Sequence, residues 1–277
     1  IEASSAVVKM PFKIETYTST TVVGGKLITV NDQLPPASAI GVSTTSYRKP
    51  AFSTVEGYPR AVSFHDGRIW YAGTTERGSR IWASKLDDFY NFLTGSADDS
   101  GLDVTLSSTE ANDILWMASH NRALVVGTTG QEWTIDGGDA ETVITPTKAR
   151  ARLRTRHGSS GIAPELIAES LLWVNRTDSC LNEFTYSFQI DGFTAPDMTQ
   201  LIGMVKGRII QTAYQSRPVS ILWAVTDLGY LYSFTYDREQ NIVAWAMHTT
   251  GEDDAHKFVS VTVAYGTTSD EVWVVAN

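Results

Sequence analysis

Short apolar runs recur in this chain with a period of about 50 residues, beginning near residue 57. Each unit holds an apolar run, a polar turn, a second apolar run, and one or two further strand-like segments. A lone four-stranded sheet leaves an apolar face exposed, so sheets of this period stack on one another. The repeat therefore predicts an all-β fold, a β-propeller-like array of about 50-residue four-stranded blades. The second runs align at Ile69, Leu124, Leu172, Leu222 and Val272, with spacings of 55, 48, 50 and 50 residues.

Two points of architecture stay open at the level of sequence. A pair of β-sandwich domains also contains short, regularly spaced strands and is the alternative fold. The fifth unit stops after its second run, Glu271–Val275, and the chain begins at Ile1 without an initiator Met. We therefore expect a piece of a longer polypeptide, with the missing strands supplied beyond Asn277 or by N-terminal strands. Helix is scarce, and only Lys85–Leu93 is expected to form one or two helical turns.

Residues 1–50 differ from the repeat. Alternating strand sequences occur at Lys13–Tyr17 and Lys26–Val30, and Gly24-Gly25 between them is typical of a hairpin turn. Proline-containing stretches then suggest a linker up to Pro50. We predict an N-terminal β segment and linker at residues 1–50, belonging to a platform or inserted domain. Residues 51–277 are predicted to form the propeller-like domain, incomplete at its C-terminal end.

The composition limits the classes of function. The formal net charge of −9 argues against general nucleic-acid binding, although an acidic wall suits a conduit through which DNA slides. The single cysteine, Cys180, excludes an intrachain disulfide framework and a cysteine zinc site. No apolar run approaches the roughly 18 residues of a membrane-spanning helix.

No motif for catalysis or metal binding stands out. Residues 98–103 only loosely resemble a calcium loop, and the acidic clusters are interpreted as solvated turns. His65, His120 and His256 are expected to be solvated loop residues, and no pair of histidines has metal-ligand spacing. Glycosidases need two suitably spaced carboxylates, which no motif nominates. The sequence thus predicts no enzyme, no cofactor and no metal.

One row of charges suggests an interface. Basic residues recur at every second position, which on a strand places five positive charges on one face. Because packing does not require such a row, we predict a counter-charged partner: acidic residues of a neighbouring subunit or, less favoured in an acidic chain, DNA phosphate. The alternative is an exposed arm with solvated charges. The candidate interface residues are Lys148, Arg150, Arg152, Arg154, Arg156 and, among exposed aromatics, Trp245.

Four motifs, in consistent order from Gly57 to Val275, resemble segments of tailed-phage structural proteins. The first resembles "GYPR-x-V-x-F-x-x-x-R-L-x-x-x-G-T", and the second "W-x-S…D-F-x-N-F". The third resembles "R-E-x-x-Y-S-x…D-x-Y-x-A-x-D-L-T", with Leu181-Asn182 in place of the basic residue, and the last "LWAV…L…TY-x-R-E-Q-x-V-x-A-W". The matching segments are Gly57–Thr74, Ile81–Phe92, Leu181–Thr199 and Ser220–Trp245.

The chain is thereby similar to the tail nozzle, or tail tubular protein B, family of short-tailed phages. The resemblance implies a virion tail protein without catalytic residues, present in the host cytoplasm during assembly. It implies a homohexameric tube below the portal and adaptor, with tail fibres attached at its side and DNA passing through it in transient contact. One alternative function is a carbohydrate- or receptor-binding propeller of the virion, with or without glycan-degrading activity. Another is a generic protein-interaction propeller that is monomeric and not associated with virions.

Overall fold

The computed structural model describes residues 12–19, 22–27 and 51–277, except 139–141, 188, 190–191, 203–204, 239, 241 and 252–255. Two compact units, Ile1–Ala51 and Phe52–Asn277, divide the chain. The described residues form strands, turns and loops, with one 3-10 turn, η2 (Gln200–Ile202). None of the helical structure described in these ranges is long and apolar enough to span a membrane.

The first unit contains an antiparallel hairpin of β1 (Phe12–Ser19) and β2 (Val22–Leu27). Gly24 and Gly25 lie inside β2, so the predicted glycine turn is wrong. The β-branched Val22 and Val23 favour a strand before the glycines, and the pairing absorbs both glycines with shifts in register. The expected strand residues 28–30 and the expected linker up to Pro50 lie outside the described residues.

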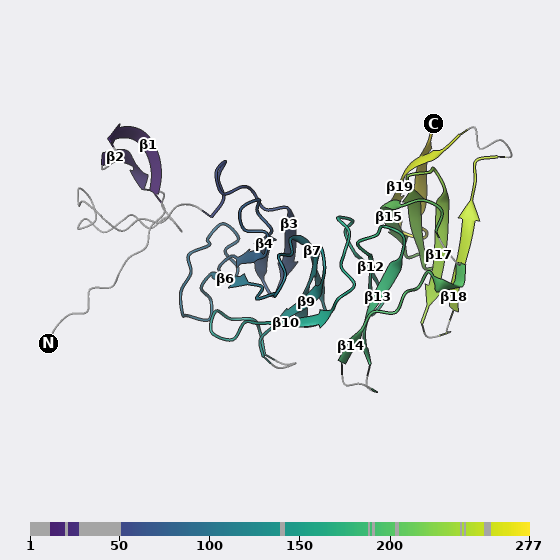
Figure 1. Cartoon of the computed structure of the whole chain (residues 1–277), viewed down its shortest axis with the longest axis horizontal. Coiled ribbons are helices and arrows are strands. Elements are labelled where there is room, and N and C mark those ends of the chain that lie inside the picture. The colour runs from purple at the N-terminus through teal and green to yellow at the C-terminus, as the bar shows by residue number, and fades with distance from the viewer. Residues whose placement is uncertain are drawn as a thin grey trace. The chain divides into compact units, whose positions relative to one another are not determined.

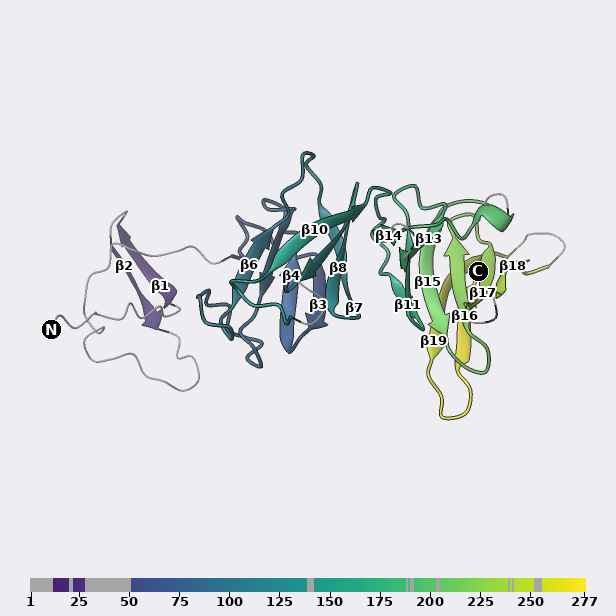
Figure 2. The same cartoon turned by 90° about the horizontal axis from the view of Figure 1, so that it is seen from below.

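The second unit contains four antiparallel sheets of four strands each, in which strands adjacent in sequence are adjacent in the sheet (Figures 1 and 2). The first sheet holds β3 (Ala61–His65), β4 (Arg68–Ala72), β5 (Arg80–Ala83) and β6 (Leu102–Thr105), and the second β7 (Ile114–His120), β8 (Ala123–Thr128), β9 (Glu132–Asp136) and β10 (Arg150–Thr155). The third holds β11 (Glu165–Ile167), β12 (Ser170–Val174), β13 (Leu181–Ser187) and β14 (Gly192–Thr194), and the fourth β15 (Ile209–Gln215), β16 (Ile221–Thr226), β17 (Leu231–Asp237) and β18 (Ile242–His248).

This connectivity gives a propeller-like array of blades. A β-sandwich joins successive strands across two sheets, whereas here the chain completes one four-stranded sheet before it begins the next. A fifth sheet contains two strands, β19 (Phe258–Ala264) and β20 (Glu271–Ala276). Strand β19 lies beside β15 of the fourth sheet (Figure 1).

Apolar side chains from consecutive sheets form the cores between them. Trp70 of the first sheet packs with Leu124 and Ile135 of the second. Trp116 of the second sheet meets Trp173 of the third, with their ring centroids 6.3 Å apart. Similar clusters join the third sheet to the fourth and the fourth to the fifth. The repeat is therefore held together by burial between neighbouring sheets.

The alignment of the third unit was off by one residue. Leu124, Leu222 and Val272 all face the preceding sheet, but Leu172 faces the following one. Leu171 occupies the equivalent position, since it packs toward the second sheet with Trp116. A shift of one residue moves a side chain to the opposite face of a strand, so the correction reverses the predicted face.

The expected helix at Lys85–Leu93 is absent. Lys85 and Asp88 form an isolated antiparallel bridge, and the Lys85 main-chain N–H donates to Asn91 O at 2.7 Å. The Asn91 side-chain oxygen accepts from the Leu93 N–H at 3.1 Å, and Asp87 has a positive φ of 56°. Asp and Asn favour such turns because their side chains compete with helical hydrogen bonds.

Candidate interface surfaces and buried polar clusters

A buried carboxylate joins the third sheet to the fourth. Glu183 of β13 is 5% exposed, and its Oε1 accepts from Ser170 Oγ at 2.6 Å. The same oxygen accepts from the Tyr236 hydroxyl at 2.7 Å and from Arg238 Nη1 at 3.0 Å. Tyr236 lies on β17 of the fourth sheet, and Arg238 directly follows that strand. Burial, together with the hydrogen bond to Glu183, raises the pKa of Tyr236 to about 12. The cluster therefore ties two sheets through a neutral phenol, a guanidinium and one anion.

Two further carboxylates lie where one sheet meets the chain segment or sheet next to it. Glu132 of β9 is fully buried and accepts from Thr155 Oγ1, at the end of β10, at 2.6 Å. It also accepts from Ser159 Oγ, on the segment that leads to the third sheet, at 3.0 Å. Asp270, before β20, accepts from the Ser216 N–H and hydroxyl at 2.8 and 2.9 Å. Burial acts to raise the pKa of Asp270, but hydrogen bonds from the Arg217 main-chain N–H and from Ser216 outweigh it, so the pKa lies below its ordinary value. We call Glu132, Glu183 and Asp270 the junction carboxylates.

A buried guanidinium organises the loop that resembles a calcium site in sequence. Arg68 of β4 is 1% exposed and donates to the main-chain oxygens of Ser84 and Ser100, each at 2.7 Å, and of Asp98 at 2.6 Å. The Asp99 carboxylate instead pairs with Lys85 Nζ at 2.9 Å. A side-chain cation thus holds the carbonyl oxygens of this loop. Across the described ranges, no three His, Cys, Asp or Glu side chains gather as a metal site.

Two histidines expected in solvent are buried between sheets. His65, which ends β3, is 5% exposed, and its Nδ1 lies 2.8 Å from Ser119 Oγ of the second sheet. His120 ends β7 in the same way, and its Nε2–H donates to Glu169 O of the third sheet at 2.9 Å. Burial lowers the pKa of His65, and Asp66 partly offsets this effect. His256 is exposed, as expected.

The predicted basic row is shorter than expected. Arg150, Arg152 and Arg154 lie on β10, whereas Lys148 lies in the preceding turn and Arg156 follows the strand. The main-chain N–H of Lys148 donates to Thr145 O, which places Lys148 in a turn, and a register shift between Leu153 and Thr155 interrupts the strand pairing. The strand therefore carries three basic positions and not five.

Part of this positive charge is neutralised within the chain. Asp136 of β9 lies 3.3 Å from Arg152 Nη1 and 3.5 Å from Arg154 Nη2. The Arg154 guanidinium also lies 4.7 Å from the ring centroid of Phe193 on the third sheet. Arg154 thus has a structural role between sheets, and Arg150 and Arg156 are the more exposed candidates for a partner.

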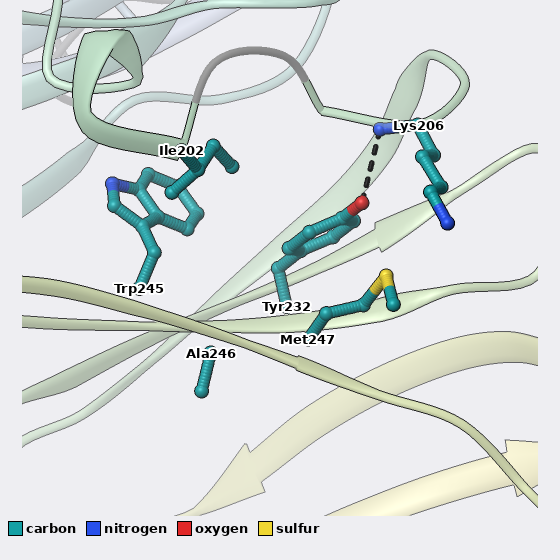
Figure 3. Close-up of a pocket in the computed structure, with 6 residues that line it drawn as sticks. All are labelled: Ile202, Lys206, Tyr232, Trp245, Ala246 and Met247. Atoms are coloured by element: carbon teal, nitrogen blue, oxygen red, sulfur yellow. Dashed lines mark hydrogen bonds between the residues drawn. The ribbon is translucent and has the colours of Figure 1, made fainter.

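Trp245 of β18 is half-buried and belongs to the fourth-sheet core. Its indole packs 4.5 Å from Phe234, centroid to centroid, and Nε1–H donates to Met198 O at 2.8 Å. One edge of the indole borders a hollow of about 240 Å³, which we call the Trp245 pocket (Figure 3). Its lining residues are Ile202, Lys206, Tyr232, Trp245, Ala246 and Met247.

The Trp245 pocket combines apolar walls with one cation. Figure 3 shows Tyr232 between Trp245 and Met247, with Lys206 on the far side of Tyr232. The Lys206 main-chain N–H donates to the Tyr232 hydroxyl at 3.0 Å, and Lys206 Nζ lies 5.3 Å from the ring centroid of Tyr230. This arrangement suits an apolar group that carries a negative charge nearby.

Sequence reasoning missed the junction carboxylates and Arg68. Each is a charged residue inside or beside a strongly apolar run, such as Glu132 before Trp133. A charge at a position that the repeat assigns to the interior predicts a buried partner. That signal names the buried group but does not identify its donors, which come from other sheets.

No family model matches the sequence, and no curated protein matches it. Among solved structures, a complex from S. cerevisiae of a Dbp5 variant with Nup159, a Gle1 variant, IP6 and ADP matches with a TM-score of 0.41 and 10% identity, over 76% of this chain and 49% of that chain. The Malassezia sympodialis allergen Mala s 1 matches with a TM-score of 0.36 and 11% identity, over 79% of this chain and 85% of that chain. This chain thus spans about half the length of the matched chain in the first of these structures.

Proposed function

We propose that this protein is a structural component of a phage tail nozzle and acts by assembly. In this proposal, copies of the chain form a ring, a hexamer in the related family, below the portal and adaptor. The ring gives ejected DNA a passage and gives tail fibres a site of attachment. Such a ring requires heterologous contacts between neighbouring copies that close on themselves.

The observation that carries the proposal is a contact between two of the phage-like motifs. Glu183 belongs to the motif at Leu181–Thr199, and Tyr236 and Arg238 belong to the motif at Ser220–Trp245. These three residues meet in the buried cluster between the third and fourth sheets. The two motifs therefore depend on each other physically, which supports the proposal that their residues serve the architecture of a structural protein.

Other motif residues also have architectural contacts. In the first motif, Arg68 holds a loop through three main-chain oxygens, and in the second, Asn91 closes the turn after β5. The net charge of −9 suits a channel wall that repels DNA enough to let it slide. The contacts of Arg68 and Asn91 hold the loop between β5 and β6 of the first sheet, which supports a structural role for these motif residues.

Immunogold labelling tests the proposal. An antibody against the chain should label the tails of virions of the phage that encodes it, at the site below the head where the nozzle lies. The proposal would be overturned if purified virions carried no label. It would also be overturned if label appeared only after the phage head had been disrupted. Release of oligosaccharides from host envelope polysaccharide by the purified chain would instead support the glycan-degrading alternative.

A further inference from the structure

We propose that β18 and the Trp245 pocket dock an extended segment of another protein. The segment adds as a further strand to the fourth sheet, with an apolar side chain at the pocket and a carboxylate near Lys206. This inference stands on the geometry of the edge strand and does not depend on the assignment to a phage tail.

Strand β18 is an unprotected sheet edge. It is the last strand of the fourth sheet, and no described strand pairs with its outer side. Its seven residues, Ile242–His248, include no proline, lysine, arginine, aspartate or glutamate, and they pair with β17 in regular register without a bulge. A long, regular, apolar edge presents a row of main-chain donors and acceptors that another strand can pair with.

The last strands of the other three four-stranded sheets carry the usual protection. Strand β10 has three arginines and a register shift, β6 has only four residues and includes Asp103, and β14 has only three residues. Charge, short length and irregular pairing all discourage the addition of a strand. The lack of these devices on β18 therefore distinguishes this edge as the docking edge.

The Trp245 pocket lies on one face of the same edge. Phe234 pairs with Trp245 and Tyr232 pairs with Met247, so these four side chains share a face of the sheet. Met247 is 44% exposed at the outer strand. In an added strand, every second side chain projects to this face, so a residue opposite Trp245 or Met247 reaches the pocket. The edge thus selects an extended backbone, and the pocket selects an apolar side chain.

Lys206 determines the charge of the occupant. Its side chain is exposed at the pocket, and no carboxylate in the described part of the chain lies within ion-pair distance of its Nζ. The β18 strand of a second copy carries no carboxylate and would leave Lys206 unpaired. A segment of a different protein, with an acidic residue close to its apolar one, pairs with the strand edge, fills the pocket and neutralises Lys206.

Selection of peptides against the full chain tests the inference. Short random peptides displayed on their own mRNA are selected on the immobilised chain, and the recovered peptides are measured by fluorescence anisotropy. We expect alternating apolar sequences that contain Asp or Glu. Their binding should slow the hydrogen exchange of amides in β18, and replacing the acidic residue by Lys should weaken binding about tenfold.

Matched variants locate the contact. Lys206→Glu should weaken the same peptides about tenfold, because it reverses the charge at the pocket. Lys257→Glu, at another exposed lysine whose hydrogen bonds are made by its main chain, should change affinity less than about twofold. The inference would be overturned if both lysine variants weakened peptide binding equally, or if the bound peptide protected amides outside β18. It would also be overturned if selection yielded no acidic peptide with an alternating, strand-like sequence. Sedimentation that shows a dimer with protected β18 amides would overturn it too, in favour of a second copy.

Discussion

The Tyr236→Phe variant tests the tie between the third and fourth sheets. The Tyr236 hydroxyl donates to Glu183 Oε1 at 2.7 Å, and Tyr236 is only 5% exposed. Its removal deletes one hydrogen bond to a charged group, a loss that typically costs about 1.5–3 kcal/mol. Because Ser170 and Arg238 still donate to the carboxylate, we expect the free energy of unfolding to fall by about 1.5 kcal/mol near neutral pH.

The same variant has a defined dependence on pH. The pKa of Tyr236 is raised to about 12 in the folded chain, against about 10 in an unfolded one. Between these values the unfolded chain releases the phenol proton while the folded chain retains it, so stability falls as the pH rises. The contribution of Tyr236 is therefore complete below about pH 10 and is lost on passing through about pH 12. One unit of pKa corresponds to about 1.4 kcal/mol, so we expect a loss of about 1–2 kcal/mol after screening by solvent.

Urea unfolding followed by tryptophan fluorescence measures both effects. The native chain should exceed Tyr236→Phe in stability near neutral pH, and this difference should shrink between about pH 10 and pH 12. Tyr265→Phe is the matched control, since Tyr265 is 74% exposed, and it should behave as the native chain throughout. Equal stability of Tyr236→Phe and the native chain near neutral pH, or a difference that stays constant into the alkaline range, would refute the reasoning.

Three further variants probe other contacts. Gly127→Val places side-chain atoms against the Trp116 ring, so urea denaturation should show a loss of about 1–3 kcal/mol, and unchanged stability would contradict the packing between the second and third sheets. Arg68→Met leaves loop carbonyls without their guanidinium donor, so limited proteolysis should cut residues 94–101 faster, and an unchanged rate would show that the loop does not depend on Arg68. Reversal of charge at Arg150 and Arg156 should leave the fold intact by circular dichroism yet impair incorporation into tails, and normal incorporation would exclude the basic segment as an interface.

The repeat was recoverable from sequence because each blade has short strands separated by polar turns. The run expected at Glu271–Val275 coincides with β20 to within one residue, and the aligned positions Ile69 and Leu222 lie on β4 and β16. Apolar runs of this length between turn residues identify strands even when neither face is known. The all-β class and the order of the strands therefore follow from the sequence.

The sequence did not reveal which side chains of β12 point toward the second sheet and which toward the fourth, for a physical reason. All five residues of β12, Ser170–Val174, are buried, so the strand has no alternation of apolar and polar side chains. A strand covered on both faces reads as a continuous apolar run, and its register cannot be taken from the pattern. The position of Leu172 becomes clear only from its neighbours in the fourth sheet.

The basic row was misjudged because a sequence shows charges without their distances. Asp136 precedes Arg152 by 16 positions and yet lies beside it across a strand pair. Likewise, no local pattern distinguishes a solvated His65 from one that is buried against Ser119 of the next sheet. Contacts between sheets link residues about 50 positions apart, which is the period of the repeat itself.

The junction carboxylates explain how a stack with apolar interfaces acquires a fixed spacing. Apolar packing is non-directional and tolerates sliding of one sheet over the next, whereas hydrogen bonds require defined distances and angles. The groups that meet these carboxylates act as donors, namely hydroxyls such as Ser159 Oγ and main-chain N–H groups such as that of Ser216. An ionised carboxylate only accepts and takes several donors at once, while an amide in its place would direct N–H groups at other donors. Glu132, Glu183 and Asp270 therefore suit these junctions through charge and acceptor number together. Glu132 fixes the segment after β10, Glu183 joins the third sheet to β17 of the fourth, and Asp270 holds the turn after β15.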